Sequence, residues 1–282
     1  MDNKEIIDYY NDCKQDYRLL WRLDKAWGLH YGYFDECDKS LTQAILKMNE
    51  QVIKHTNINE SSYVLDAGCG YAGTAMYIAE KHKCHIEAIT IVDEQVDTAN
   101  KIIKEKNLDK YVNVTNQDYT KTNFKNNTFD VIYGIESICH GNKKEFLKEA
   151  YRILKPGGIL VIFDGYNTKE KNEYTKKELQ YMKYWNNGWA VDSLETGNFF
   201  IQESKKVGFI NQEYKVITNN VIKTSKVLYY ASYPAVVVDF FGRVFKKRSK
   251  YNKGNVKAAK YQYICMKKNL WEYGIFKAIK KD

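Results

Sequence analysis

Tyr63-Val-Leu-Asp-Ala-Gly-Cys-Gly-Tyr-Ala-Gly73 combines a short apolar run with glycines in the spacing G-x-G-x-x-G. The apolar run 63–67 predicts a buried strand, and residues 74–82 have the pattern of a helix. Glycines between a strand and a helix permit a tight turn and let a ligand approach the backbone at the helix N-terminus. The stretch therefore predicts the first strand–helix unit of a ligand-binding α/β fold.

Apolar runs and helical patterns alternate downstream of this unit. Lys155-Pro-Gly-Gly158 stops the last predicted helix before a final apolar run. Further strands are predicted at 86–91, 111–115, 129–134 and 159–163, with helices at 96–106 and 145–154. Continuous apolar strands separated by helices are typical of a parallel sheet covered on both faces. The expected fold class is a doubly wound α/β sheet.

The charge of the chain is unevenly placed. The 282 residues include 44 Lys and Arg against 35 Asp and Glu, a formal net charge of +9. Residues 241–282 alone hold 13 basic and 2 acidic residues, so the positive charge belongs to this segment. A local charge without a recognisable nucleic-acid module argues against nucleic acid as a partner.

The cysteines, the N-terminal segment and the apolar runs together indicate the cellular compartment in which the protein is expected. The six cysteines form no CxxC pair and have no histidine at zinc-finger spacing, so neither a metal site nor a disulfide framework is expected. The first twelve residues are acidic and polar, unlike a signal peptide. The stretch 227–245 is interrupted by Asp239 and Arg243 and is a poor candidate for a membrane span. A cytoplasmic location is the resulting expectation.

Asp66 stands two positions before the first glycine of the loop, and its charge selects among ligands. A carboxylate at this place repels a pyrophosphate in a desolvated cleft and attracts an ammonium group. A ligand with a nucleoside at one end and a cationic amino acid at the other suits both the glycines and the carboxylate. S-adenosylmethionine is such a ligand, and it is the cofactor we expect.

Val64-Leu-Asp-Ala-Gly-Cys-Gly70 resembles the first motif of class I S-adenosylmethionine-dependent methyltransferases. The resemblance implies a Rossmann-like methyltransferase sheet with an N-terminal helical cap and a helical lid inserted before the last strand. It also implies that the methionine end of the cofactor is held by Asp66, Gly68, Cys69, Gly70 and Gly73.

Two further segments are similar to the family's nucleoside-binding motifs. Asn116-Gln-Asp-Tyr119 resembles the loop whose aspartate, here Asp118, accepts a hydrogen bond from the adenine amino group. Thr90-Ile-Val-Asp-Glu-Gln95 lacks the acidic residue that usually binds the ribose and resembles a subgroup that carries Thr and Gln instead. The resemblance implies nucleoside contacts from Thr90, Ile91, Gln95, Asp118 and Tyr119, with Asp93 as the competing choice for the ribose.

That subgroup includes the tocopherol, sterol side-chain and geranyl diphosphate methyltransferases, with the cyclopropane fatty acid synthases close by. Trp27-Gly-Leu-His-Tyr-Gly-Tyr-Phe34 is similar to an element of their N-terminal cap. Gly134-Ile-Glu-Ser-Ile-Cys-His140 is similar to a segment of the sterol enzymes, and Leu270-Trp-Glu-Tyr-Gly-Ile-Phe-Lys277 to the closing strand of the tocopherol group. The resemblance implies a small lipophilic acceptor, a contact of Tyr33 with the methionine carboxylate, and an acceptor pocket that includes Tyr10, His30 and Tyr31.

These segments divide the chain into three expected regions. Residues 1–50 are helical in pattern, rich in Tyr and Trp, and form the cap. Residues 51–168 form the cofactor-binding core. Residues 169–282 complete the core sheet through a helical stretch at 169–183, a helix–strand unit at 199–218 and a last strand at 273–279, with the lid inserted at about 219–270.

Glu136 and His140 are the candidate catalytic residues. Methylation of an olefin leaves a carbocation, which a carboxylate and aromatic faces stabilise until a base removes a proton. Glu136 follows the fourth strand at its C-terminal end, the edge where doubly wound sheets bind ligands. We expect Glu136 to act as base or cation stabiliser with assistance from His140. The alternative is that Glu136 bonds loop backbone and His140 only begins a helix.

The stretch 227–250 is apolar and aromatic and then strongly basic. One interpretation is a lid over the acceptor, with Arg243, Lys246, Lys247 and Arg248 near an anionic head group. A second is peripheral docking of this basic C-terminal segment at a membrane surface. The third is a core-packing helix with a solvated basic end. The oligomeric state is left open by the sequence.

The sequence therefore favours a methyltransferase that acts on a small lipophilic acceptor, most simply at carbon. An N- or O-methyltransferase of a small amine or phenol is the alternative. Enzymes that methylate the exocyclic amines of bases usually carry an Asn/Asp-Pro-Pro-aromatic tetrapeptide after the fourth strand, and this chain has Gly134-Ile-Glu-Ser137 there. A catalytically dead cofactor-binding scaffold is disfavoured because Asp66, the glycines and Asp118 are all present.

Overall fold

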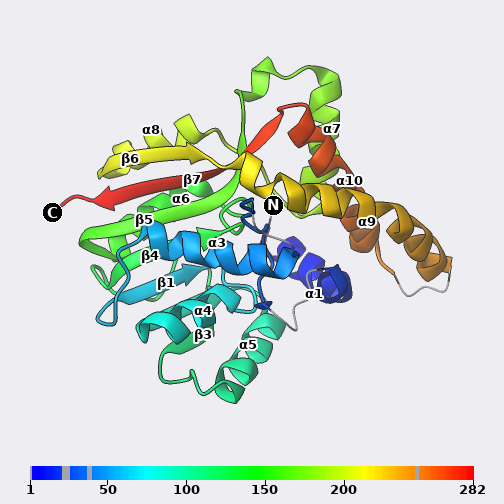
Figure 1. The fold of residues 1–282 in the computed structure, drawn as a ribbon. Coiled ribbons are helices and arrows are strands. Elements are labelled where there is room, and N and C mark those ends of the chain that lie inside the picture. Colours follow the sequence, from blue (N-terminus) through cyan, green and yellow to red (C-terminus); the bar gives the residue numbers. More distant parts are fainter. Residues whose placement is uncertain (1, 21–25, 37–39, 245–247) are drawn as a thin grey trace.

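One seven-stranded sheet organises the molecule, in the order β3-β2-β1-β4-β5-β7-β6 (Figure 1). The computed structural model describes residues 2–20, 26–36, 40–244 and 248–282. The first five strands are parallel, and β7 runs antiparallel to both β5 and β6. The strands are β1 (Tyr63–Ala67), β2 (His85–Thr90), β3 (Val112–Asn116), β4 (Phe129–Ile135), β5 (Leu154–Asn167), β6 (Phe209–Val216) and β7 (Trp271–Lys280).

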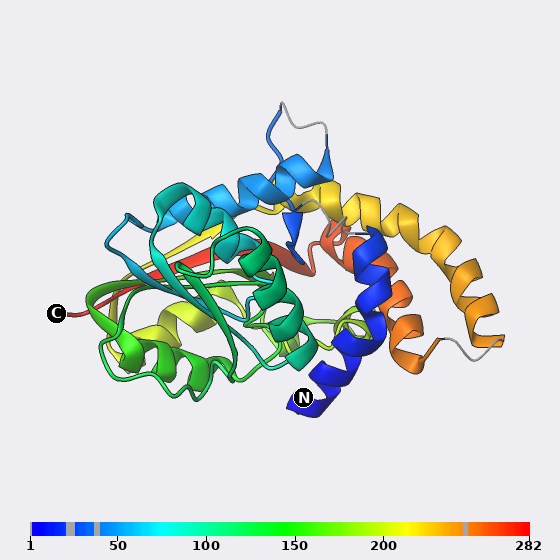
Figure 2. The same ribbon diagram turned by 90° about the horizontal axis from the view of Figure 1, so that it is seen from below.

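Helices cover both faces of the sheet and extend beyond it on one side. They are α1 (Asn3–Leu20), α3 (Leu41–His55), α4 (Gly73–His82), α5 (Asp93–Glu105), α6 (Lys143–Ile153), α7 (Lys176–Gly188), α8 (Gly197–Val207), α9 (Thr218–Val244) and α10 (Lys250–Lys267), with a 3-10 turn at Lys171–Glu173. Figure 2 shows α1, α9 and α10 gathered on the side of the sheet away from the C-terminus.

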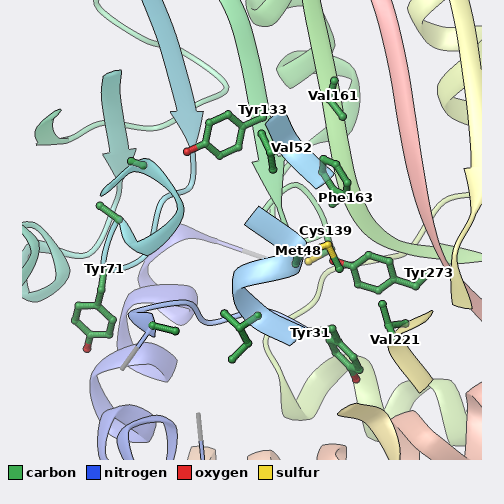
Figure 3. Close-up of a cluster of buried hydrophobic side chains, with 14 of the residues drawn as sticks. Tyr31, Met48, Val52, Tyr71, Tyr133, Cys139, Val161, Phe163, Val221 and Tyr273 are labelled. Carbon is green, nitrogen blue, oxygen red and sulfur yellow. The ribbon is translucent and has the colours of Figure 1, made fainter. Parts of the chain in front are cut away.

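Successive side chains of the central strands point to opposite faces of the sheet, and each face packs into its own hydrophobic core. Val64 of β1 packs with α3, α4 and α5 on one face, whereas its neighbour Leu65 packs with α6 and α8 on the other. Figure 3 shows Met48 of α3 near Phe163 of β5 within the first of these cores. The predicted α/β sheet with helices on both faces is therefore confirmed.

Three local features differ from the sequence predictions. The helix expected at 169–183 begins only after Thr175, whose hydroxyl accepts a hydrogen bond from the Glu178 amide in a capping box. The fifth strand starts at Leu154, because the Pro-Gly-Gly segment bulges and stays paired with β4 instead of turning away from it. Within the cap region, residues 28–36 are not helical and carry the His30–Tyr33 element.

Arg248 ties the three outlying helices together. Its guanidinium donates to both carboxylate oxygens of Asp16 in α1, at 2.8 and 2.9 Å, and to Asp239 in α9, at 3.1 Å. Arg248 directly precedes Ser249, the N-cap of α10. Two acceptor-only carboxylates thus pair with this cation, and Arg248 also lines a cavity beside these helices, so a place for it near an anionic head group stays a prediction. Lys246, Lys247 and the side chain of Arg243 lie outside what the structure describes.

Candidate active site

The glycine loop after β1 adopts a conformation that requires its glycines. Gly68 has a φ of +90°, and a Cβ there would lie 2.3 Å from the Cβ of Ser137. A Cβ on Gly73 would lie 2.5 Å from the carbonyl oxygen of Trp27. The loop therefore fits closely against the end of β4 on one side and against the 26–36 segment on the other.

A cavity of about 250 Å³ opens beside this loop, and we call it the cofactor cavity. Ten predicted cofactor residues line it: Asp66, Gly68, Cys69, Gly70, Gly73, Thr90, Ile91, Gln95, Asp118 and Tyr119. Tyr33 does not; it lies outside the cavity, where its amide donates to the carbonyl of Ala44. Leu29 and His30 of the same segment reach the cavity instead.

Asp66 lies at the buried end of the cofactor cavity. Its carboxylate is 3% exposed and accepts one hydrogen bond, from the Tyr133 hydroxyl at 2.8 Å. Burial raises the pKa of Asp66 to about 7, although the Tyr133 bond works in the opposite direction. A cationic group placed against this carboxylate would relieve the cost of burying its charge, which is the chemistry that an ammonium ligand supplies.

The opposite wall offers polar groups in fixed orientations. The Thr90 hydroxyl donates to Oε1 of Gln95 at 2.7 Å, so the amide nitrogen of Gln95 is directed away from this bond. Asp118 accepts the amide and hydroxyl of Thr120 and the side-chain amide of Asn3, and these hydrogen bonds hold its pKa below the usual value despite partial burial. Asp93 is exposed and accepts from Asn116.

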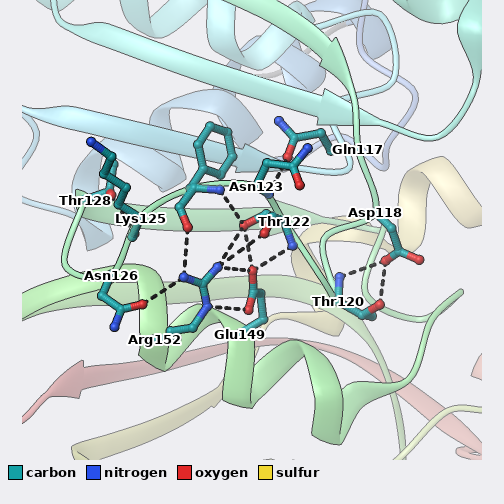
Figure 4. A network of polar contacts seen from close by, with 11 residues as sticks. Gln117, Asp118, Thr120, Thr122, Asn123, Lys125, Asn126, Thr128, Glu149 and Arg152 are labelled. Atoms are coloured by element: carbon teal, nitrogen blue, oxygen red, sulfur yellow. Dashed lines mark hydrogen bonds and ion pairs between the residues drawn. The ribbon is translucent and has the colours of Figure 1, made fainter.

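A network from α6 fixes the loop that carries Asp118 (Figure 4). Glu149 accepts the amide and hydroxyl of Thr122, at 2.7 and 2.6 Å. Arg152 pairs with Glu149 through two nitrogens and also donates to the carbonyl of Phe124. These charge-assisted bonds support the loop that places Asp118 in the wall of the cavity.

A second cavity of about 240 Å³, here the acceptor cavity, lies between the sheet and α1, α7, α9 and α10. Its walls are mainly aromatic and aliphatic, contributed by Tyr17, Tyr31, Trp185, Trp189, Trp271 and Tyr273 and by Val191, Leu194, Leu228, Ala231, Ala235, Val238, Val256 and Ala259. The rings of Trp185 and Trp271 lie 4.2 Å apart between centroids. Such a cavity accommodates an apolar ligand and presents aromatic faces to any positive charge formed within it.

The two cavities share four lining residues: Tyr10, Leu29, Glu136 and His140. Both predicted catalytic residues therefore lie where a ligand of one cavity meets a ligand of the other. Tyr10, predicted for the acceptor pocket, lies at the same junction, and Tyr31 lines the acceptor cavity as predicted.

Glu136 accepts two hydrogen bonds at this junction. Its φ of +50° lies in the left-handed region, which it shares with eight other non-glycine residues of the described ranges. Oε1 accepts the Tyr31 amide at 2.7 Å and the Tyr273 hydroxyl at 2.8 Å. Burial raises the pKa of Glu136 to about 8, although both hydrogen bonds lower it. This raised pKa suits a proton acceptor that works near neutral pH.

His140 is a neutral hydrogen-bond acceptor in this arrangement. Burial lowers its pKa to about 4, so the ring carries one proton near neutral pH. Nδ1 lies 2.8 Å from the carbonyl oxygen of Ala190, which can only accept, so Nδ1 holds that proton. Nε2 therefore accepts from the Tyr10 hydroxyl at 3.0 Å, and this bond fixes α1 to the junction.

Sequence reasoning missed two residues beside Glu136. Tyr273 of β7 donates a hydrogen bond to Glu136 from 137 positions away in the chain. The segment 270–277 resembles a closing strand of related enzymes, but that resemblance predicted no role for Tyr273. Asp164 of β5 lines the acceptor cavity, accepts the Cys139 amide at 2.9 Å, and has its pKa raised by burial to about 6. Its place towards the C-terminal end of a parallel strand was the signal that could have identified it.

His30 is placed differently from its predicted role. It lines the cofactor cavity rather than the acceptor cavity. Its buried imidazole lies between the carbonyl oxygen of Tyr31 and the side chain of Asn49 in α3. His30 therefore holds the 26–36 segment against α3 and does not reach the acceptor cavity. Within the described ranges no group of three His, Cys, Asp or Glu side chains could hold a metal ion.

Comparison with solved structures confirms the fold. A cyclopropane synthase from Mycobacterium tuberculosis superposes with a TM-score of 0.83 over 99% of each chain at 16% identity. A geranyl diphosphate methyltransferase in complex with geranyl diphosphate and sinefungin superposes with a TM-score of 0.77 over 98% of each chain at 15% identity.

Sequence comparisons find relatives named for methylation at carbon and relatives named for methylation at nitrogen. 24-Methylenesterol C-methyltransferase 3 of Arabidopsis thaliana is 29% identical over 243 residues, which cover 83% of this chain and 66% of that protein. A sterol 24-C-methyltransferase of Saccharomyces cerevisiae is 30% identical over 172 residues, 61% of this chain and 44% of that protein. The chain thus spans about half to two thirds of the length of these relatives. The family model described as mycolic acid cyclopropane synthetase matches residues 2–224, and the chain belongs to that family.

Proposed function

We propose that this protein is an S-adenosylmethionine-dependent methyltransferase that methylates carbon in a small lipophilic acceptor, such as an isoprenoid or other lipid. The observation that carries the proposal is the position of Glu136 between a glycine-lined cavity and an aromatic, apolar one. The relatives named for sterol and geranyl diphosphate methylation support the choice of acceptor class.

The cofactor cavity suits the two ends of S-adenosylmethionine, whose bound form supplies an electrophilic methyl group. Asp66 would bind the ammonium group, and the glycines let the carboxylate end lie close to the loop, whose Gly68 and Cys69 amides already donate to the carbonyl of Ile89. Gln95 and Thr90 bind the ribose, and Asp118 accepts from the adenine amino group. The presence of all four side chains in the wall of the cofactor cavity supports these assignments.

At the junction the residues of this chain align the reactants, exclude water and move one proton. Methyl addition to a carbon–carbon double bond leaves a cation on the acceptor, which the rings of Tyr31, Trp271 and Tyr273 stabilise. Glu136 then removes a proton from the neighbouring carbon and regenerates the double bond. His140 and Tyr10 hold each other in place and close the junction to water.

A transfer assay with methyl-labelled S-adenosylmethionine against fractionated lipid and polar extracts tests the proposal, with products read by mass spectrometry. We expect label in a lipid fraction, attached to carbon. Label only in an amine or phenol would replace C-methylation by the N- or O-methyltransferase alternative. Binding of the cofactor without label in either fraction would contradict a small-molecule acceptor.

The pH dependence of turnover follows from the raised pKa of Glu136. Only the carboxylate form can accept a proton, so kcat/KM should rise about tenfold per pH unit below pH 8 and level off above it. Tyr273→Phe removes a hydrogen bond that stabilises the carboxylate and should move this rise to higher pH. Steady-state kinetics across the pH range measure both, and a profile that is flat from pH 6 to 9 would contradict the base role.

We further propose that α1 and the 26–36 segment act as a cap over the cofactor and that α9 and α10 act as a lid over the acceptor. Both pairs line the cavities that they would close. Contact of the basic C-terminal segment with a membrane belongs to the same proposal, because a lipophilic acceptor resides in a lipid phase.

A further inference from the structure

The outer face of α9 is apolar and uncovered. In the described part of the chain, all large apolar side chains that are exposed lie on this helix except Ile210 and Val216. The α9 members are Val227, Tyr230, Tyr233, Val236, Val237, Val238, Phe240 and Phe241, each between 49% and 61% exposed. Most recur at intervals of three or four residues and so form one continuous face of the helix. We call this set the outer face of α9.

The inner face of the same helix lines the acceptor cavity through Leu228, Ala231, Ser232 and Ala235. Val238 belongs to both faces, because it lines the cavity and is also 61% exposed. Val238 therefore stands between the acceptor cavity and the solvent at the outer face of α9. Figure 2 shows this half of α9 extending beyond the rest of the molecule.

We propose that the outer face of α9 docks on an anionic lipid bilayer and that the acceptor enters the cavity from the bilayer beside Val238. The proposal rests on the proposed lipophilic acceptor and adds the surface through which that acceptor is delivered. None of the helices in the described ranges is long and apolar enough to cross a membrane, so α9 lies along the surface.

The lysines around the outer face of α9 favour an anionic lipid surface as the partner that covers it. Lys223 and Lys226 are exposed on α9 itself, two turns and one turn before Tyr230. Lys260 of α10 lies over the ring of Tyr233 at 5.5 Å. Apolar side chains that enter the acyl region and lysines that reach the headgroups together make an interfacial membrane site.

A second copy of this chain suits the surface less well. A two-fold contact through the outer face of α9 would press Lys226 and Lys260 of each copy against apolar side chains of the other. The loss of water around these cations would oppose the burial of the apolar side chains, whereas anionic headgroups neutralise them. Charge complementarity therefore favours the bilayer.

The test uses the full chain without cofactor or acceptor, so its outcome is independent of catalysis. Co-sedimentation with phosphatidylcholine vesicles containing phosphatidylserine should show binding that weakens with salt and is lost on phosphatidylcholine alone. The triple variant Tyr230→Ser, Val237→Ser, Phe241→Ser should weaken binding at least about tenfold, since burial of one large apolar side chain already has that effect. Ile210→Ser with Val216→Ser changes exposed apolar residues on β6 and should leave binding unchanged.

Absence of vesicle binding by the unaltered chain, or equal binding by the triple variant, would overturn the proposal. A dimer in light scattering that the triple variant abolishes, without vesicle binding, would assign the outer face of α9 to a second copy and also overturn it. Circular dichroism and the affinity for S-adenosylmethionine check that the variants are folded. Loss of vesicle binding with retained methylation of a detergent-dispersed lipid would leave the proposed function intact.

Discussion

Glu136→Gln should lower kcat by about 10²–10⁴-fold, the usual contribution of a positioned general base. Glutamine has nearly the same shape, and its carbonyl oxygen can still accept from the Tyr31 amide and the Tyr273 hydroxyl. The variant therefore removes the proton acceptor while it preserves the hydrogen bonds that place the side chain. Quenched assays of product formation give kcat, and titration calorimetry gives the Kd of the cofactor.

Glu145→Gln is the matched control, because Glu145 is an exposed carboxylate on α6 that lines neither cavity. It should leave both constants unchanged. The Kd of the cofactor should change less than about threefold in Glu136→Gln, since Asp66 provides the charge in that cavity. Full turnover in Glu136→Gln would rule out the base role and leave this residue as a support for the Tyr31 backbone.

Asp66→Asn should raise the Kd of S-adenosylmethionine by about 30-fold to several thousand-fold, because removal of one partner from a buried charge pair costs about 2–5 kcal/mol. In the unaltered protein the Kd should also fall as pH rises from about 5 to about 7, since burial raises the pKa of Asp66 to about 7 and only its ionised form attracts an ammonium group. The variant should lose that pH dependence. Calorimetric titrations at several pH values measure both effects.

Asp93→Asn provides the comparison for this substitution. Asp93 is an exposed carboxylate in the first turn of α5, and the cavity wall does not include it. The Asp93→Asn variant should bind the cofactor as tightly as the unaltered chain does. A large loss of affinity in Asp93→Asn, with none in Asp66→Asn, would reverse the two assignments and place the cofactor's charged contact on α5.

The cofactor side of the site could be predicted from the sequence because its signals are local. The loop from Asp66 to Gly73 is a contiguous motif whose backbone geometry demands glycine, as the φ of Gly68 shows. Thr90 and Gln95 are likewise close in sequence and hydrogen-bond each other. Apolar runs that alternate with helical patterns also predicted the five parallel strands along the chain, although not their order in the sheet.

The acceptor side depends on contacts between distant segments, which leave no pattern in the sequence. Tyr273 meets Glu136 only because β7 inserts beside β5. On the cofactor side, Tyr33 was misplaced for a related reason, because residues 28–36 have no regular period to indicate which side chains face inward. The helix α9 is apolar on both faces for different reasons, so hydropathy alone could not separate its cavity wall from its outer face.

Helix α1 contributes to both cavities, and this shared wall has a kinetic consequence. Asn3 and Ile6 line the cofactor cavity, Asp16 and Tyr17 line the acceptor cavity, and Tyr10 lines both. An α-helix moves as a rod, so a shift of its first turns on cofactor binding also moves the wall of the other cavity. By thermodynamic reciprocity, whatever factor the cofactor adds to acceptor affinity, the acceptor adds to cofactor affinity. Under the proposed function, loss of the lipid product would then weaken the binding of the demethylated cofactor, so that the two products would leave together.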